Sequence, residues 1–141
     1  METEVSGLST RWNSKMREDK YNINAALRNL RPGAEWFLLG QDYSGLKWLD
    51  TEQEKPTEEE VVQKQAELRY QEEVNEYQGQ RAREYPSYAD QFDQIFHDGI
   101  DAWKATILEV KRRYPKQVME PEVLEERKRQ ALADLEASRA E

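Results

Sequence analysis

The spacing of apolar residues predicts that most of this chain is helical, with a short β-hairpin near its start. Residues 22–30 place apolar side chains on one helical face, and Asn22 precedes them as a capping residue. Residues 34–40 and 46–49 are aromatic and branched, which is typical of strands, and Asp, Ser and Gly between them favour a turn. A two-stranded hairpin is marginal alone in water, so we expect the preceding helix or a partner sheet to cover its apolar face.

A long uninterrupted helix is predicted over residues 57–85. Thr57 and Glu60 have the spacing of a capping box, and acidic residues occupy the first turn, where the positive end of a helix favours them. The apolar stripe is narrow and repeats mostly every four residues, so it favours packing on one side and does not specify a long coiled coil. Its members are Val62, Ala66, Tyr70, Val74 and Tyr77.

Residues 86–116 predict two helices joined by a tight turn. Ser87 is the expected cap of the first helix and Asp101 that of the second. Asp98-Gly99 supplies the turn between them, and Pro115 ends the second helix. Both helices have apolar residues at helical spacing. We therefore expect this segment to hold the best small core of the chain, made by Tyr88, Phe92, Ile95, Phe96, Trp103, Ile107, Val110 and Tyr114.

The two ends of the chain are more polar. Residues 1–20 carry Leu8, Trp12 and Met16 at helical spacing, which fits either a short helix or an arm that becomes ordered only against a neighbour. Residues 122–139 predict a last helix whose apolar stripe is thin. We expect this acidic C-terminal segment, residues 117–141, to be peripheral and either solvated or docked on a partner.

The predicted fold is therefore mainly α with a small N-terminal β-hairpin (α+β), elongated, with a long central helix and a helical hairpin. Its segments are an arm (1–20), a helix and β-hairpin module (21–56), a long helix (57–85), a helical hairpin (86–116) and a peripheral helix (117–141). Only 37% of residues are hydrophobic and 35% are charged, too few apolar groups for a thick core. Seven Tyr and four Trp nevertheless favour a folded chain. We expect the isolated chain to be partly ordered or self-associated, with order centred on 86–116.

Charge and hydropathy exclude several classes of partner. The net charge is -8 and no segment is basic, which argues against nucleic acid, whose phosphates require clustered positive charge. The longest apolar run, residues 36–39, is far too short for a membrane span, and the N-terminus does not have the pattern of a signal peptide. The sequence contains no cysteine, so disulfides and thiolate metal sites are excluded.

His97 is the only histidine and the only candidate centre for chemistry. Asp93 lies four residues earlier on the same helical face, which would suit a metal corner or a general base held by a carboxylate. A helix-terminal role explains His97 more simply, because a cationic imidazole is favoured at the negative end of a helix. No second histidine completes a transition-metal set. We predict no catalytic, cofactor-binding or metal-binding residue, and no cofactor.

Several aromatic residues allow two interpretations. A carbohydrate-binding platform would use Trp36, Tyr43, Trp48, Tyr88 and Trp103 for host recognition. Packing in a core or between subunits is favoured, since these residues occupy strands or periodic helical positions. On the same reasoning, the candidates for a protein interface are Trp36, Phe37, Trp48, Val62, Tyr70, Val74, Tyr77, Leu124 and Leu135.

Two stretches of the chain resemble modules of bacteriophage tail proteins. The first contains Tyr85-Pro86-Ser87, His97-Asp98-Gly99 and Tyr114-Pro115-Lys116 in order, and it resembles a module that closes tail-fibre or other virion polypeptides. The second contains Leu30-Arg31-Pro32-Gly33, Gly45-Leu46 with Trp48-Leu49-Asp50, and Lys55-Pro56-Thr57, and it looks like the module that commonly precedes the first. Together they cover roughly residues 21–116, so both ends of the chain lie outside the resemblance.

The resemblance implies a non-enzymatic structural protein of the phage tail, a fibre or baseplate-associated subunit of the virion that is made in the host cytoplasm. Its partners would be other phage tail proteins, in a homo-oligomer or hetero-assembly, and a small-molecule ligand is not expected. An alternative is an assembly chaperone for the tail fibre that is absent from the mature virion. A third possibility is a phage-encoded enzyme centred on His97.

Overall fold

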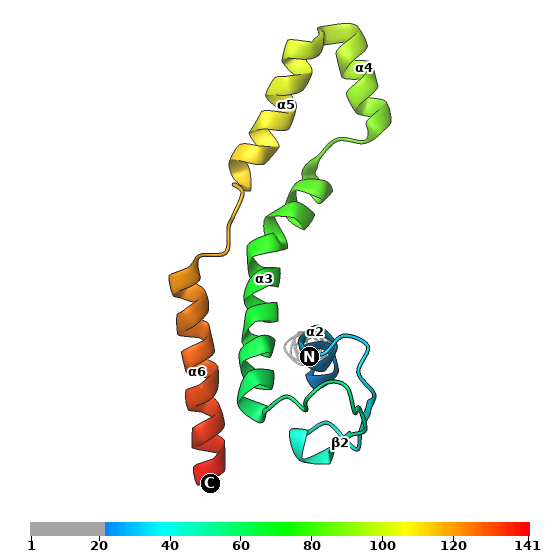
Figure 1. Cartoon of the computed structure of the whole chain (residues 1–141). Coiled ribbons are helices and arrows are strands. Elements are labelled where there is room, and N and C mark those ends of the chain that lie inside the picture. The colour runs from blue at the N-terminus through cyan, green and yellow to red at the C-terminus, as the bar shows by residue number, and fades with distance from the viewer. Residues whose placement is uncertain (1–21) are drawn as a thin grey trace, which may run out of the picture. The chain divides into compact units, whose positions relative to one another are not determined.

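The computed structural model describes residues 22–141, so the arm expected at residues 1–20 lies outside the described part of the chain. The described residues are mainly helical with one small antiparallel hairpin, which confirms the predicted fold class (Figure 1). The elements in chain order are α2 (Ile23–Leu30), β1 (Trp36–Leu38), η1 (Tyr43–Gly45), β2 (Leu46–Trp48), α3 (Glu58–Glu84), α4 (Tyr88–Asp98), α5 (Ile100–Arg113) and α6 (Pro121–Ala140).

The buried core of the N-terminal segment forms where α2 meets the hairpin and the start of α3. The side chain of Asn22 accepts a hydrogen bond from the Ala25 N–H and begins α2, as the sequence predicts. Ala26 and Leu27 of α2 are fully buried against Leu46 and Val61. The surrounding, partly buried side chains are Ile23, Leu30, Trp36, Leu38, Tyr43 and Trp48. The helix that precedes the hairpin thus covers it within the chain.

The strands of the hairpin are shorter than the sequence suggests. Trp36 pairs with Trp48 and Leu38 with Leu46, and the predicted turn contains the short 3₁₀ helix η1. Gly45 is required at the end of this turn because a side chain there would overlap the carbonyl of Leu39. The Leu39 N–H donates to the Gly45 carbonyl over 2.9 Å, so the two backbones meet directly.

The long helix α3 begins with the predicted capping box. The Glu60 N–H donates to the Thr57 hydroxyl, and the Glu60 carboxylate accepts from the Thr57 N–H, over 3.1 and 3.0 Å. Along the predicted stripe, Ala66, Tyr70 and Val74 are buried, whereas Val62 and Tyr77 are half-buried. The stripe is therefore the packing side of α3.

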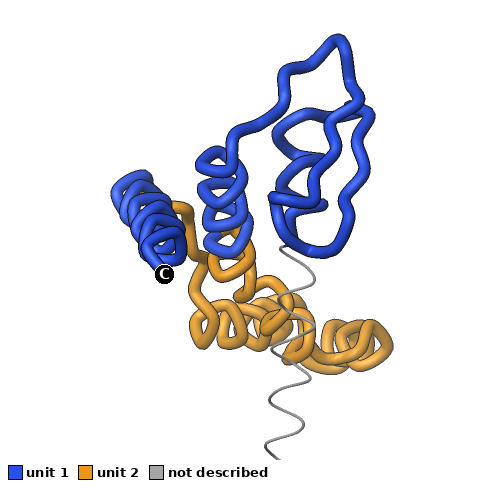
Figure 2. Tube along the Cα trace, turned by 90° about the horizontal axis from the view of Figure 1, so that it is seen from below, with its two compact units in different colours: residues 1–70, 121–141 blue, residues 71–120 orange. Residues whose placement is uncertain are grey.

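The chain divides into two compact units, and the boundary lies inside α3 (Figure 2). The first contains residues 1–70 and 121–141, and the second residues 71–120. This division differs from the predicted segments, which kept residues 57–85 together and set 117–141 apart. In the first unit, α6 places Arg127 over the ring of Tyr70 and buries Leu135. The C-terminal helix is therefore docked on its own chain rather than only solvated.

The second unit contains the predicted pair of helices. The Ser87 hydroxyl caps α4 by accepting from the Asp90 N–H, and Gly99 turns the chain with a φ of 91°. Gly99, not Asp101, is the residue that caps α5, so Asp101 lies in the first turn instead. From the second half of α3, Arg81 donates to the Tyr114 carbonyl over 2.8 Å and so satisfies the end of α5.

The expectation that residues 86–116 hold the best small core is wrong. None of the side chains of α4 is buried, and Val110 is the buried residue of α5. The largest buried cluster of the described chain belongs to the first unit instead. The second unit consequently has an apolar surface that its own helices do not cover.

Candidate interaction surface

Three aromatic side chains form an exposed stripe along α4. Tyr88, Phe92 and Phe96 follow each other at intervals of four residues, so they lie on one side of the helix. Their exposed fractions are 82%, 69% and 83%, values that are unusual for large apolar side chains in successive turns. We call these three residues the aromatic stripe. Exposed apolar patches of this kind are typical of surfaces that bind another apolar surface.

Polar side chains, rather than the aromatic stripe, join α4 to α5. The amide of Gln94 donates to the Thr106 hydroxyl over 2.7 Å, and the Trp103 indole N–H donates to the Gln91 side-chain oxygen over 3.0 Å. Gln91 also anchors the start of the helix through the Pro86 carbonyl. Because these glutamines occupy the side of α4 that faces α5, the aromatic residues are turned away from it.

The adjoining helix α5 has a second exposed stripe. Ile100 and Leu108 are 56% and 55% exposed, and the exposed Lys104 lies between them at the same four-residue spacing. Further along, Lys111 and Arg112 are exposed as well. This helix therefore combines apolar side chains with positive charge.

His97 contacts the last ring of the aromatic stripe. Its ring meets that of Phe96 edge to face, with 5.0 Å between the centroids. Its place in the last turn of α4 fits the helix-terminal role that the sequence favours. Among residues 22–141, no group of acidic and histidine side chains is arranged to hold a metal ion.

The two tryptophans predicted as interface candidates lie in the first unit and pack within the chain. Trp36 and Trp48 face each other across the hairpin and border the buried cluster. The Trp48 indole N–H also donates to the Gln53 carbonyl over 2.9 Å. Phe37, one residue along the strand, points to the other face and is 46% exposed. Of these three residues, only Phe37 is open to a partner.

The remaining interface candidates are largely covered as well. Tyr70 and Val74 are buried, and the guanidinium of Arg81 lies 4.9 Å from the ring centroid of Tyr77. In α6, Leu135 is buried and Leu124 half-buried. The helical spacing of Tyr88, Phe92 and Phe96 predicted that they form a core, but the three side chains are exposed. Spacing alone does not say which side of a helix faces solvent. The hydrogen bonds that Gln91 and Gln94 make with α5 identify the inner side of α4.

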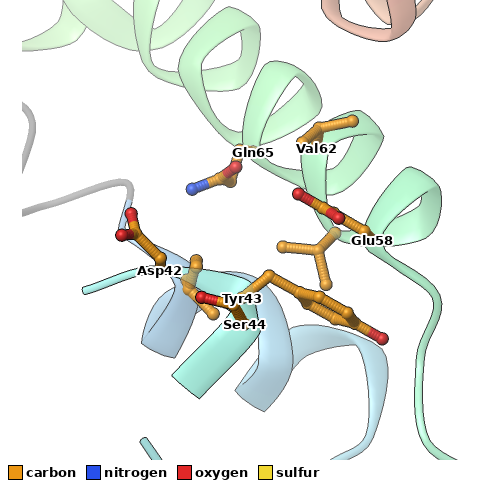
Figure 3. Close-up of a pocket in the computed structure, with 8 residues that line it drawn as sticks. Asp42, Tyr43, Ser44, Glu58, Val62 and Gln65 are labelled. Carbon is orange, nitrogen blue, oxygen red and sulfur yellow. The ribbon is translucent and has the colours of Figure 1, made fainter. Parts of the chain in front are cut away.

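An open pocket lies in the first unit, next to η1 and the start of α3 (Figure 3). Its volume is about 330 Å³, and Val62 contributes to its wall. Burial raises the pKa of Tyr43, and the carboxylates of Glu58, Glu59 and Glu60 raise it further. The Tyr43 hydroxyl donates to the Pro56 carbonyl over 2.6 Å, so it is engaged in holding the fold. The lining residues are Ile23, Asp42, Tyr43, Ser44, Glu58, Val61, Val62 and Gln65.

Comparison of this chain with protein families, with curated proteins and with solved structures finds no match. Within the described residues, none of the helices has the length and apolar character needed to cross a membrane.

Proposed function

We propose that this chain is a non-enzymatic structural component of a bacteriophage tail, a fibre or baseplate-associated subunit that acts through protein–protein contacts. The observation that carries the proposal is the aromatic stripe, whose residues are 69–83% exposed. A soluble domain seldom leaves three aromatic side chains uncovered in consecutive helical turns without a partner for them. Tyr and Phe are also typical of the centres of protein interfaces.

Of the motifs that resemble phage tail modules, those within residues 85–116 support the same proposal, because they begin and end the two helices that carry this surface. Tyr85-Pro86-Ser87 ends α3 and caps α4, and Asp98-Gly99 makes the turn into α5. Tyr114 ends α5, where Arg81 holds its carbonyl. These residues begin and end the two helices, so their part in the proposal is structural. The proposal assigns no catalytic role to His97.

A tail-fibre assembly chaperone is the second candidate. The same stripe favours it in one respect, because a chaperone needs an exposed apolar surface that binds its client and later releases it. A small interface suits such a transient contact. The two candidates differ in whether the chain remains in the finished particle.

A mass-spectrometric inventory of the proteins in purified particles tests the proposal. The particles are produced in the host strain that carries the gene. A structural subunit is expected at a fixed ratio to the other tail proteins. Absence from particles, together with co-purification with a fibre polypeptide from lysates, would favour the chaperone. Absence from both would overturn the proposal.

A matched pair of variants relates incorporation to the surface. Phe96→Ser removes one aromatic ring of the stripe and should lower incorporation into particles. Leu39→Ser changes a residue of the first unit that is 61% exposed and should leave incorporation unchanged. Equal incorporation of both variants would show that the stripe is not the binding surface.

A further inference from the structure

The helix α6 runs antiparallel to the first half of α3 and keeps one register along it. Near the end of α6, Arg139 donates to Glu58 at the start of α3. Twelve residues later in α3 and twelve earlier in α6, the guanidinium of Arg127 lies 5.5 Å from the ring centroid of Tyr70. Equal steps along both helices therefore keep them side by side (Figure 2). Leu135 lies between these two contacts and is buried.

The buried core of the first unit and α6 cover opposite sides of α3. Val61 belongs to the core, together with residues of α2 and β2. Tyr70 follows nine residues later, and at about 100° per residue this turns it roughly 180° away from Val61. Ala66 is also buried, and it lies only about 40° from Tyr70, on the side that faces α6. Within the described residues, the core cluster includes no side chain of α6, so its packing does not depend on that helix.

The contacts that hold α6 in place are few and lie mostly at the surface. Leu135 is the buried residue of this helix. The side chains of Arg139 and Glu59 are 49% and 47% exposed, and exposed ion pairs of this kind contribute little and are screened by salt. Helices in proteins depend mainly on the packing of an apolar face, which is thin in α6. Elements with so few buried apolar contacts open at a lower free energy than the core does.

We propose that α6 is a releasable strap, which leaves α3 as one unit while the core around Val61 stays folded. Residues 115–120, which connect α5 to α6 and contain no helix or strand, supply the hinge. Opening uncovers Ala66 and Tyr70, a second apolar side of α3 that is closed in the structure described. Salt favours the open form because it screens the contacts of Arg139. The inference concerns the first unit and does not depend on the proposed function, which concerns the aromatic stripe of the second.

Cysteine labelling compares the two sides of α3 in the full chain, which has no cysteine of its own. The variant A66C places a thiol beneath α6, and V61C places one beneath the core. A buried thiol reacts with Ellman's reagent only when the element that covers it moves away. We expect A66C to react at least about tenfold faster than V61C, and rising salt to accelerate A66C alone.

Substitution of Arg139 tests whether its contacts close the strap. In the A66C chain, Arg139→Gln should raise the labelling rate about threefold, which corresponds to the loss of a modest exposed ion pair. The matched control is Arg129→Gln, whose ion pair with Glu126 lies within α6 and should not affect closure. Neither substitution should change the labelling rate of V61C.

Equal labelling rates for A66C and V61C would overturn the inference, because α6 would then open only when the whole unit unfolds. Equal acceleration of both thiols by Arg139→Gln would overturn it as well. Urea titration of each cysteine variant gives its unfolding free energy, so that the rates are compared at known stability. If either variant fails to fold by circular dichroism, hydrogen exchange of the wild-type chain replaces the thiols. The amides of α6 should then exchange faster than that of Leu27 and respond alone to salt, and a common rate would contradict the strap.

Discussion

Arg139 lies 2.8 Å from Glu59, measured from its Nη1 atom to the carboxylate Oε1, although 80 residues separate the two in sequence. The same guanidinium donates to Glu58 over 3.0 Å. These bonds join the end of α6 to the first turn of α3. They also place the Arg139 guanidinium near Glu58 and Glu59, whose carboxylates lie at the N-terminal end of α3, where the helix dipole favours negative charge.

Replacing Arg139 should loosen α6 most strongly at neutral and mildly acidic pH. The hydrogen bond from Arg139 lowers the pKa of Glu59 below its ordinary value of 4.5. A lowered pKa in the folded state contributes stability above the ordinary value, and this stability is lost as pH falls through the lowered pKa. We expect Arg139→Gln to make Tm depend less on pH below about 4.5, where the carboxylate of Glu59 becomes protonated.

The control for this prediction is Arg129→Gln, whose ion pair with Glu126 spans only three residues of α6. Hydrogen exchange should be faster throughout α6 in Arg139→Gln and nearly unchanged in the control. Because both guanidiniums are at the surface, high salt should reduce the difference. Equal exchange in the two variants would contradict the docking of α6 through Arg139.

Asp50 should be important for the open end of the β-hairpin. Its carboxylate accepts hydrogen bonds from the N–H groups of Gln53, Glu35 and Glu52, which lower its pKa. The associated stability is present above the ordinary pKa of 3.8 and is lost as pH falls through the lowered value. Asp50→Asn should lower Tm at pH 7 and remove part of the acid sensitivity. A thermal melt that matches wild type at both pH 7 and pH 3 would contradict this role.

Leu27 should contribute far more to stability than Leu108, although both are leucines in helices. Leu27 is fully buried, so Leu27→Ala should cost about 2–5 kcal/mol of unfolding free energy through lost burial and the cavity left behind. Leu108 is 55% exposed, and Leu108→Ala should change the unfolding free energy by roughly 0.5 kcal/mol or less in the monomer. Urea titration at low protein concentration measures both, and similar losses would contradict the assigned position of the core.

Tyr43 should make stability depend on alkaline pH. Burial first, and then the acidic start of α3, raise the pKa of Tyr43 above its ordinary value of 10.0. A raised pKa in the folded state contributes stability below the ordinary value, and this stability is lost as pH rises through the raised value. Tyr43→Phe should cost about 1 kcal/mol at pH 7 through the lost bond to Pro56, and its stability should fall less above pH 10 than that of wild type.

The matched control for this substitution is Tyr88→Phe, at a tyrosine that is 82% exposed. Chemical denaturation of the monomer at pH 7 should give the wild-type unfolding free energy for this variant. An equal loss in both variants would show that the Tyr43 hydroxyl contributes nothing specific.

Local patterns were sufficient to predict where most elements begin and end. Asn22, Ser87 and the pair Thr57 and Glu60 act on backbone groups within four residues of themselves, so their effect can be inferred from spacing alone. The sequence predicted that Asp101 caps α5, but Gly99 is the cap. With its positive φ, Gly99 ends α4 and begins α5 at the same residue. Strand ends were less certain, since the position of η1 depends on contact between Leu39 and Gly45.

The candidate surface could not be placed from the sequence, because periodicity gives the angle between side chains and not the direction of the core. Tyr88, Phe92 and Phe96 have the pattern of a core face, and it is their exposure, together with the bonds made by Gln91 and Gln94, that shows which side is inside. Contacts such as that between Arg139 and Glu59 join distant residues and have no local signature. The proposed tail function combines the exposed aromatic stripe with the motif resemblance, and it stays a prediction.

Photo-crosslinking from position 96 in assembling particles shows whether the aromatic stripe contacts a partner. A photoreactive phenylalanine analogue replaces Phe96, and in a matched chain it replaces Leu39, which is exposed on the first unit. We expect covalent products with a second copy or another tail protein from position 96, and few or none from position 39. No product from position 96 in a chain that is present in the particles would contradict it.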